Sequence, residues 1–207
     1  RVDRGHHRPL AGDSEAVEAV KLAARYHQTL VWERTRHLLR LRAALREFFP
    51  AALTVFDDLD APDALELLAL APDPDRAAKL TRRQITAALR RARRHHVEDR
   101  VTQIMGVLRA EDLRRSAAVQ AAYAAVVASQ AAVLQALNTQ IEAIGEVVKT
   151  HFGVHPDAEI YASQPGLGPI LGARVLGEFG DDPHRYADAR SRKNYAGTAP
   201  ITRASGK

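Results

Sequence analysis

Residues 164–180 read Gln164-Pro-Gly-Leu-Gly-Pro-Ile-Leu-Gly-Ala-Arg-Val-Leu-Gly-Glu-Phe-Gly180, and this stretch decides how the end of the chain folds. Its opening residues cannot continue a helix, because Gly166 and Gly168 open positive φ and Pro169 suits the first position of a new helix. After Pro169 the apolar residues recur at helical spacing, and Gly180 supplies a C-terminal stop. The stretch therefore predicts two helices joined by a tight turn.

The two turn glycines also expose bare backbone amides at the start of the second helix. Amides at a helix N-terminus, where the dipole is positive, bind phosphate without a side chain, as in a helix-hairpin-helix. The alternative is a purely structural turn between packed helices. Basic residues near the turn favour contact with the DNA backbone, which positions a protein without reading sequence. The predicted DNA-binding residues here are Gly166, Gly168, Arg174, Arg192, Lys193 and Arg203.

Four short motifs in this region carry a resemblance to a known family. They are Pro165-Gly-Leu-Gly-Pro169, Phe179-Gly-Asp181, Tyr195-Ala-Gly-Thr-Ala-Pro200 and Thr202-Arg-Ala-Ser-Gly206. In order and spacing they resemble the C-terminal domain of transposases of the insertion-sequence one-ten/one-sixteen type. That family is related to the pilin-gene invertases and is named for a DEDD carboxylate site.

The resemblance implies a RuvC-type nuclease domain joined through a coiled coil to a small helical domain, and the use of a guide RNA. It also implies four acidic residues that hold a divalent metal (Mg²⁺) in an N-terminal domain, and a serine nucleophile. The matching serine is Ser205, within Arg203-Ala-Ser-Gly206. No run here matches the acidic domain, so we assign no metal ligand to Asp3, Asp57 or Asp181. The chain alone is expected to be inactive.

Composition limits the classes of protein to consider. The 207 residues are 46% hydrophobic and include no cysteine, which excludes disulfides, thiolate zinc sites and cysteine nucleophiles and fits the cytoplasm. No apolar run approaches the roughly 20 residues that span a bilayer. The net charge of +5 comes mostly from arginine, whose planar fork suits phosphate, although codon usage in a GC-rich genome gives the same bias. Because the chain starts at Arg1 and stops after a loop-like Ala-Ser-Gly, we expect a fragment.

A long helix is predicted after an extended lead-in over residues 1–13. Asp13 and Ser14 offer N-cap oxygens, and the helix should end at Phe49-Pro50. Polar residues His27 and Arg34 interrupt its apolar seam, and we favour a register-setting or solvated role for them over a ligand or a catalytic base. The heptad seam consists of Val17, Val20, Ala24, His27, Val31, Arg34, Leu38, Leu41, Leu45 and Phe48.

Residues 51–110 are predicted to form short helices broken by prolines. Thr81 and Gln84 have the spacing of a capping box, which predicts a helix from Arg82 to about Arg94, and another helix is expected over 99–108. The first of these carries the densest basic cluster in the chain, which is either a solvated face or a nucleic-acid contact. We select Arg90, Arg91 and Arg94 as DNA-binding residues.

A second long helix is predicted from about Arg115 to Phe152, with a seam at Val119, Tyr123, Val126, Gln130, Val133, Leu137, Ile141, Ile144 and Val148. Two such helices around a compact middle predict an antiparallel pair, and unpaired seam positions favour a dimer or higher homo-oligomer. Gly153 and Pro156 break the helix, so His151 and His155 are not assigned to zinc.

The predicted fold is therefore all-α, with long coiled-coil helices bracketing a small helical insert and a truncated helix-hairpin-helix domain at the end. The predicted regions are 1–13, 14–152 with an insert at 51–110, and 153–207. As function we expect DNA binding and recombination within a transposase. A non-enzymatic helix-hairpin-helix DNA-binding protein and a coiled-coil adaptor are the alternatives.

Overall fold

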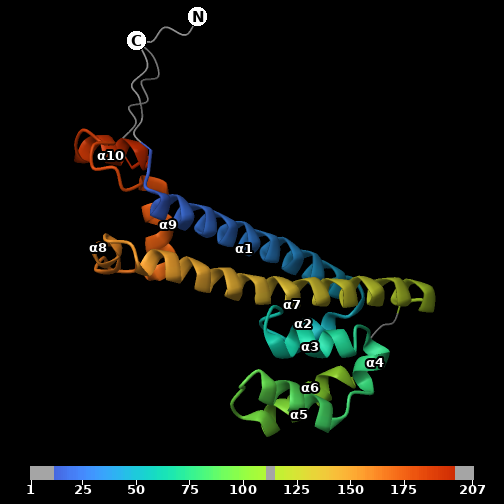
Figure 1. Ribbon diagram of the computed structural model, residues 1–207. Helices are drawn as coiled ribbons and strands as arrows, with labels where there is room; N and C mark the ends of the chain where they lie inside the picture. Colours follow the sequence, from blue (N-terminus) through green and yellow to red (C-terminus); the bar gives the residue numbers. More distant parts are fainter. Residues whose placement is uncertain (1–11, 111–114, 199–207) are drawn as a thin grey trace, which may run out of the picture. The chain divides into compact units, whose positions relative to one another are not determined.

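The computed structural model describes residues 12–110 and 115–198, and throughout these residues the regular structure is helical, which confirms the predicted all-α class (Figure 1). The helices are α1 (Glu15–Phe48), α2 (Pro50–Val55), α3 (Pro62–Leu70), α4 (Pro74–Ala78), α5 (Arg82–Arg91), α6 (Val97–Leu108), α7 (Ala117–Gly153), α8 (Ala158–Ala162), α9 (Pro169–Phe179) and α10 (Ala189–Tyr195). Contacts group them into two compact units. One combines residues 1–25 with 146–207, and the other is residues 26–145.

Helix α1 begins and ends where the sequence predicts. The Ser14 hydroxyl accepts a hydrogen bond from the Val17 amide at 3.2 Å, which satisfies one of the unpaired amides of the first turn. Pro50 follows the last residues of α1 and opens α2. Most of the predicted apolar seam of α1 is buried, including its polar member His27.

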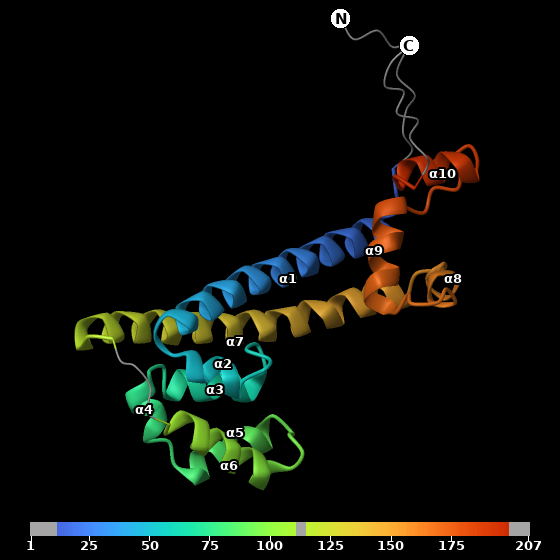
Figure 2. The ribbon, with the colours of Figure 1, turned by 180° about the vertical axis from the view of Figure 1, so that it is seen from behind.

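In the unit of residues 26–145, α1 and α7 run antiparallel, as predicted, and both views show them side by side there (Figures 1 and 2). Phe48 stacks on Tyr123 with ring centroids 5.0 Å apart, whereas at the other end of the pair Gly145 packs against the ring of His27. Rising numbers on α1 therefore meet falling numbers on α7.

A polar layer crosses the middle of this pair. Arg34 Nη1 donates to Asn138 Oδ1 at 3.3 Å, and Arg34 Nε lies 3.5 Å from Asp60 Oδ2. The Asn138 amide in turn donates to the Asp60 carbonyl at 2.9 Å. Because a shifted register would leave these half-buried groups unpaired, the arrangement agrees with the register-setting interpretation of Arg34.

The predicted seam of α7 is wrong by one residue within this unit. The side chains that enter the core are Ala124, Val127, Ala131 and Leu134, whereas the predicted Val119 and Val126 are exposed. Both stripes follow steps of three and four, so spacing alone did not separate them. The choice depends on which stripe the partner helices cover.

Helix α7 also corrects the expectation about apolar runs. No charged residue occurs between Arg115 and Glu142, and by length and composition the helix is apolar enough to cross a membrane. This property was missed in the sequence because glutamine residues interrupt the alanine-rich segments, although glutamine carries no charge. A core helix of a soluble protein has the same property, so a single helix of this kind is weak evidence for a membrane.

The short helices of the predicted insert, 51–110, share one hydrophobic core with α1 and α7, in which Leu65 and Ile85 are buried together with Leu45 and Leu134. Pro50, Pro62 and Pro74 open α2, α3 and α4, where the missing amide costs nothing. The predicted capping box is confirmed, because the Thr81 hydroxyl accepts from the Gln84 amide and the Gln84 side chain accepts from the Thr81 amide. Helix α5 ends at Arg91, three residues before the predicted end.

The unit that contains the C-terminal region has a second core, built from the start of α1, the end of α7, α8 and α9. Its centre includes Val17, Val20, Phe152 and Leu176, all nearly inaccessible to solvent. Gly177 allows α9 to approach α1 closely, because a Cβ at this position would lie 2.9 Å from the Lys21 Cα. The approach fixes where the turn between α8 and α9 lies on this unit.

Candidate nucleic-acid interface

The predicted turn lies between α8 and α9, at residues 163–168. Gly166 has φ +81°, which only glycine adopts readily, and the Leu167 amide closes the turn on the Gln164 carbonyl at 3.2 Å. Gly168 is the N-cap of α9 but has φ −74° and ψ 176°, so the predicted positive φ at Gly168 is wrong. Pro169 occupies the first turn of α9, as expected.

The backbone at this turn presents several open donors. Pro169 has no amide, and the Gly172 amide is bonded to the Gly168 carbonyl at 2.8 Å. The amides of Gly166, Gly168, Ile170 and Leu171 make no hydrogen bond within residues 12–110 and 115–198. These donors lie at the positive end of an 11-residue helix, an arrangement that can bind an anion.

Helix α10 follows in the same unit and carries Arg190, Arg192 and Lys193. Asp188 caps it by accepting from the Ser191 amide at 2.7 Å. The guanidinium of Arg192 lies over the rings of Phe179 and Tyr186, at 5.4 Å and 5.2 Å from their centroids, and Tyr195 completes the aromatic cluster. Stacking holds the cation in place and leaves its hydrogen-bond donors free for a phosphate.

Two other predicted residues of this region have different surroundings. Lys193 is exposed, and its ammonium makes no ion pair with other residues in the described part of the chain. Arg174 instead lies partly inside the unit, and burial lowers the pKa of its guanidinium. Arg203 and Ser205 lie outside the described residues.

A buried ion pair holds the start of α1 against the loop that follows α9. The Asp13 carboxylate, almost completely buried, accepts from the Arg185 guanidinium and lies 3.6 Å from Lys21 Nζ. Gly180, with φ +73°, passes beside this pair, and a Cβ there would overlap both Asp13 and Arg185. Arg185 is therefore a structural residue, which its place in a basic stretch of sequence did not indicate.

His155 is the only buried histidine described in this unit, and it belongs to the same structural joint. Its Nδ1 accepts from the Asp157 amide at 3.1 Å, and its Nε2 lies 3.5 Å from Asp181 Oδ2. Burial acts to raise the pKa of the Asp181 carboxyl, but hydrogen bonds from Ser14 and His155 outweigh it and lower the pKa. These contacts account for His155 without a metal.

In the insert, two of the three predicted arginines bind carboxylates of α3. Arg94 donates to both oxygens of Asp63, at 3.1 and 2.9 Å, and Arg91 donates through Nε and Nη2 to Glu66, with Nε at 3.0 Å. Asp63 is 4% exposed, so Arg94 compensates a charge that is otherwise buried. The three-residue spacing of Asp63 and Glu66 mirrors that of Arg91 and Arg94, a signal in the sequence that the prediction missed.

A different set of cations on and beside α5 remains open. Arg83, Arg90 and Arg93 are exposed, and their guanidinium groups make no ion pair or hydrogen bond with other residues that the structure describes. Only Arg90 was selected from the sequence. Arg83 and Arg90, seven residues apart, lie on the same face of α5.

The described residues contain no cluster of metal-binding side chains. Within residues 12–110 and 115–198, no group of three or more histidine, aspartate or glutamate side chains converges in a metal-binding arrangement. The divalent metal that a DEDD family implies is therefore not assigned to residues 12–110 or 115–198.

Comparison with family models gives two matches, one at each end of the chain. Residues 158–207 match the family described as "Transposase IS116/IS110/IS902 family", and residues 1–50 match the transposase model named for DEDD and IS110. The second match corrects the expectation that no run here resembles the acidic domain, because that model extends over the lead-in and all of α1.

Curated relatives align along nearly the whole chain. A Streptomyces coelicolor protein named for the mini-circle transposase of IS117 is 42% identical over 212 residues, which cover 100% of this chain and 51% of the relative. An IS900 protein of 42 kDa from Mycobacterium paratuberculosis is 32% identical, covering 95% of this chain and 49% of the relative. A 44.8 kDa IS116 protein from Streptomyces clavuligerus is 27% identical, covering 96% and 49%. The chain thus spans about half the length of these relatives, and no solved structure matches it.

Proposed function

Because this chain belongs to the IS110/IS116 family of transposases, we propose that it is the nucleic-acid-engaging portion of an insertion-sequence transposase that recombines DNA. The observation that carries the proposal is the group of open amides at the start of α9, within the residues that match the family. Arg192 and Lys193 on α10, in the same unit, would add positive charge. Contacts of this kind go to phosphate and position the protein on DNA.

The proposal includes the finer features that follow from family membership. Residues 153–207 would be part of a helix-hairpin-helix transposase domain, and the pairing of α1 with α7 would extend into a coiled coil that assembles a homo-oligomer. DNA and a guide RNA would be the partners, in the cytoplasm. The metal would be held by acidic residues outside the described part of the chain, where it would polarise the scissile phosphate.

Ser205 would be the nucleophile of the full-length protein. Its oxygen would attack the scissile phosphorus and lose its proton, the P–O bond to one deoxyribose would break, and that sugar would leave as a protonated hydroxyl end. The other DNA end would stay joined to Ser205 as a phosphodiester, and Arg203 would neutralise the developing charge. Ser205→Ala in the full-length protein should abolish strand exchange and leave DNA binding intact, because association depends on charge. Wild-type strand joining by this variant would remove Ser205 from the mechanism.

The binding proposal is tested best at Gly168. Its backbone angles suit a β-branched residue, and a Cβ there meets no atom within 4 Å, so Gly168→Val should fold normally. Its side chain would block the open amides and weaken binding to duplex DNA similarly for every sequence. Gly106→Val is the matched control, because Gly106 also faces open space but lies on α6. Unchanged affinity of a folded Gly168→Val protein would make the turn purely structural.

A further inference from the structure

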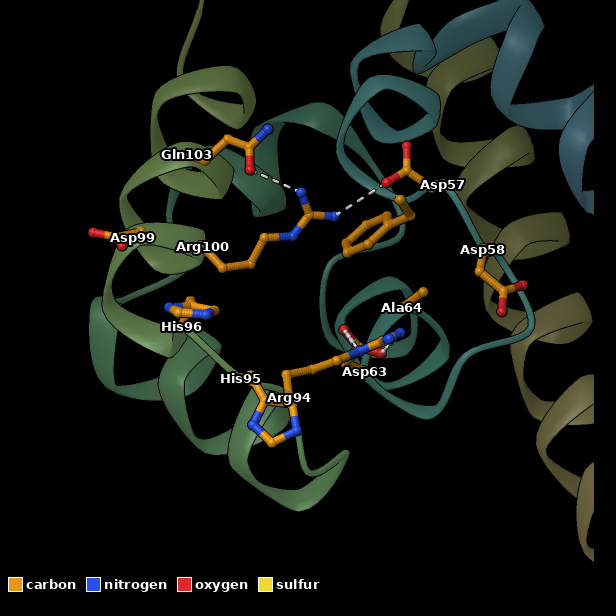
Figure 3. Close-up of a pocket in the computed structure, with 11 residues that line it drawn as sticks. Asp57, Asp58, Asp63, Ala64, Arg94, His95, His96, Asp99, Arg100 and Gln103 are labelled. Atoms are coloured by element: carbon orange, nitrogen blue, oxygen red, sulfur yellow. Dashed lines mark hydrogen bonds and ion pairs between the residues drawn. The ribbon is translucent and has the colours of Figure 1, made fainter.

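A cavity of about 600 Å³ opens in the insert (Figure 3). Its walls come from the loop after α2, the start of α3, the loop between α5 and α6, and the first turns of α6. The volume is in the range of sites that hold one small organic group. The DNA contacts predicted for the basic residues of α5 do not involve the interior of this cavity.

The loop between α5 and α6 has an unusual backbone. Arg93 and His96 have φ +55° and +51°, the left-handed region that residues with a side chain seldom occupy. Such conformations are often kept where a site needs them. Here the loop presents His95 and His96, whose imidazoles line the cavity and are exposed to solvent (Figure 3).

Both arginines of the wall already have hydrogen-bond partners. Arg94 is bonded to Asp63, and Arg100 donates to Gln103 Oε1 at 2.8 Å and to the Val55 carbonyl. Three further carboxylates, Asp57, Asp58 and Asp99, also line the cavity, and Asp57 Oδ2 lies 3.9 Å from Arg100 Nη2. The interior is therefore poorly suited to a phosphate and better suited to an uncharged planar group with hydrogen-bond donors.

We propose that this cavity receives an unpaired nucleobase of single-stranded nucleic acid. The imidazoles of His95 and His96 would stack on the base, and wall carboxylates would accept from its exocyclic amine. The phosphates on either side would contact Arg90 and Arg93, which lie four residues and one residue before the wall residue Arg94. The proposal rests on the proposed nucleic-acid function and adds to it a site for one base, from either RNA or DNA.

The test compares the wild-type chain with His95→Ala/His96→Gly, which removes both rings and keeps every arginine and lysine. Glycine at position 96 also relieves the left-handed backbone, so the variant should fold. Fluorescence anisotropy measures binding to labelled cytosine 12-mers of DNA and RNA, and to an abasic 12-mer with the same phosphates. His184→Ala, which removes an exposed histidine of the other unit, is the matched control.

The variant should bind at least one cytosine 12-mer about tenfold more weakly than wild type, the effect of losing base stacking. Its affinity for the abasic strand and for duplex DNA should not change. The cytosine strand that responds, DNA or RNA, identifies the source of the base. Equal affinities of wild type and variant for both cytosine strands would overturn the cavity proposal alone. A wild-type chain that binds neither duplex nor single strands would overturn the proposed function and the cavity proposal with it.

Discussion

Helix α5 and the α8–α9 turn were both predicted to contact DNA because of basic residues, but the groups available to a ligand differ between the two regions. In α5 and the loop that follows it, Arg91 and Arg94 bind carboxylates of α3, which neutralise their charge. At the turn, the donors are backbone amides, and on α10 in the same unit Arg192 is held by aromatic rings instead of carboxylates. The density of arginine in a sequence is therefore a poor measure of the charge available to a ligand.

The first prediction tests the rigidity of the unit that carries the turn. Gly180→Ala should lower the free energy of unfolding by about 3 kcal/mol, because a side chain there needs an unfavourable positive φ and disturbs the buried pair of Asp13 and Arg185. Urea unfolding followed by circular dichroism measures the change. Gly168→Ala is the control and should be nearly neutral, because its backbone is ordinary and its surroundings are open. Equal free energies of unfolding for the two variants would show that close packing of Gly180 against Asp13 and Arg185 contributes little to stability.

The second prediction separates the two kinds of arginine on the insert. Arg94→Ala should lower the free energy of unfolding by about 2 kcal/mol, since it leaves the carboxylate of Asp63 buried without its partner. The loss stays below the full penalty because Arg94 is itself half exposed. Arg90→Ala, the matched control, should leave stability within about 0.5 kcal/mol of wild type. If both variants unfold alike, the carboxylates of α3 do not distinguish them.

These contrasts show which parts of the fold the sequence could predict. Local signals gave the ends of α1, the capping box of α5 and the proline starts of the insert, because each depends on neighbouring residues. The buried stripe of α7 was missed by one residue, because its position depends on contacts with distant parts of the chain. The antiparallel pairing was predicted, whereas its polar layer of Arg34, Asp60 and Asn138 required the structure.

The candidate site was predictable to a similar degree. Glycine and proline around residue 168 indicated a turn with open amides, because their backbone properties are local. The partner of Arg185 was not predictable in the same way, since Asp13 is far from it in the sequence. The cavity beside His95 and His96 had no signal in the sequence, because it needs four segments of the insert to come together.

The third prediction concerns the salt dependence of binding. Arg83→Ala/Arg90→Ala should reduce the slope of log affinity against log salt concentration for duplex DNA by about 1 to 2, because each open arginine that meets a phosphate releases a counterion. Fluorescence anisotropy over a series of salt concentrations measures the slope. The control is Arg82→Ala, whose arginine is already paired with Glu98 at 3.1 Å. An unchanged slope in the double variant would show that Arg83 and Arg90 make no phosphate contacts with duplex DNA.

The last prediction concerns Asp58 and Asp60, of which Asp60 belongs to the polar layer with Arg34 and Asn138. A hydrogen bond with the Asp58 carboxyl, followed by burial, raises the pKa of Asp60, although Arg34 opposes the shift. A carboxyl with a raised folded pKa stabilises the fold below its ordinary value of about 3.9 and loses that stabilisation as the pH rises through the folded value. At pH 7 the ionised pair therefore costs stability.

Asp58→Asn should raise the free energy of unfolding at pH 7 by about 0.5 kcal/mol and gain less than wild type on acidification to pH 5. Urea unfolding at both pH values, with the exposed Glu142→Gln as control, measures this difference. An Asp58→Asn protein that loses stability at pH 7 would mean that Asp58 acts mainly as a hydrogen-bond partner of the turn, and repulsion between the two carboxylates would then be the smaller effect.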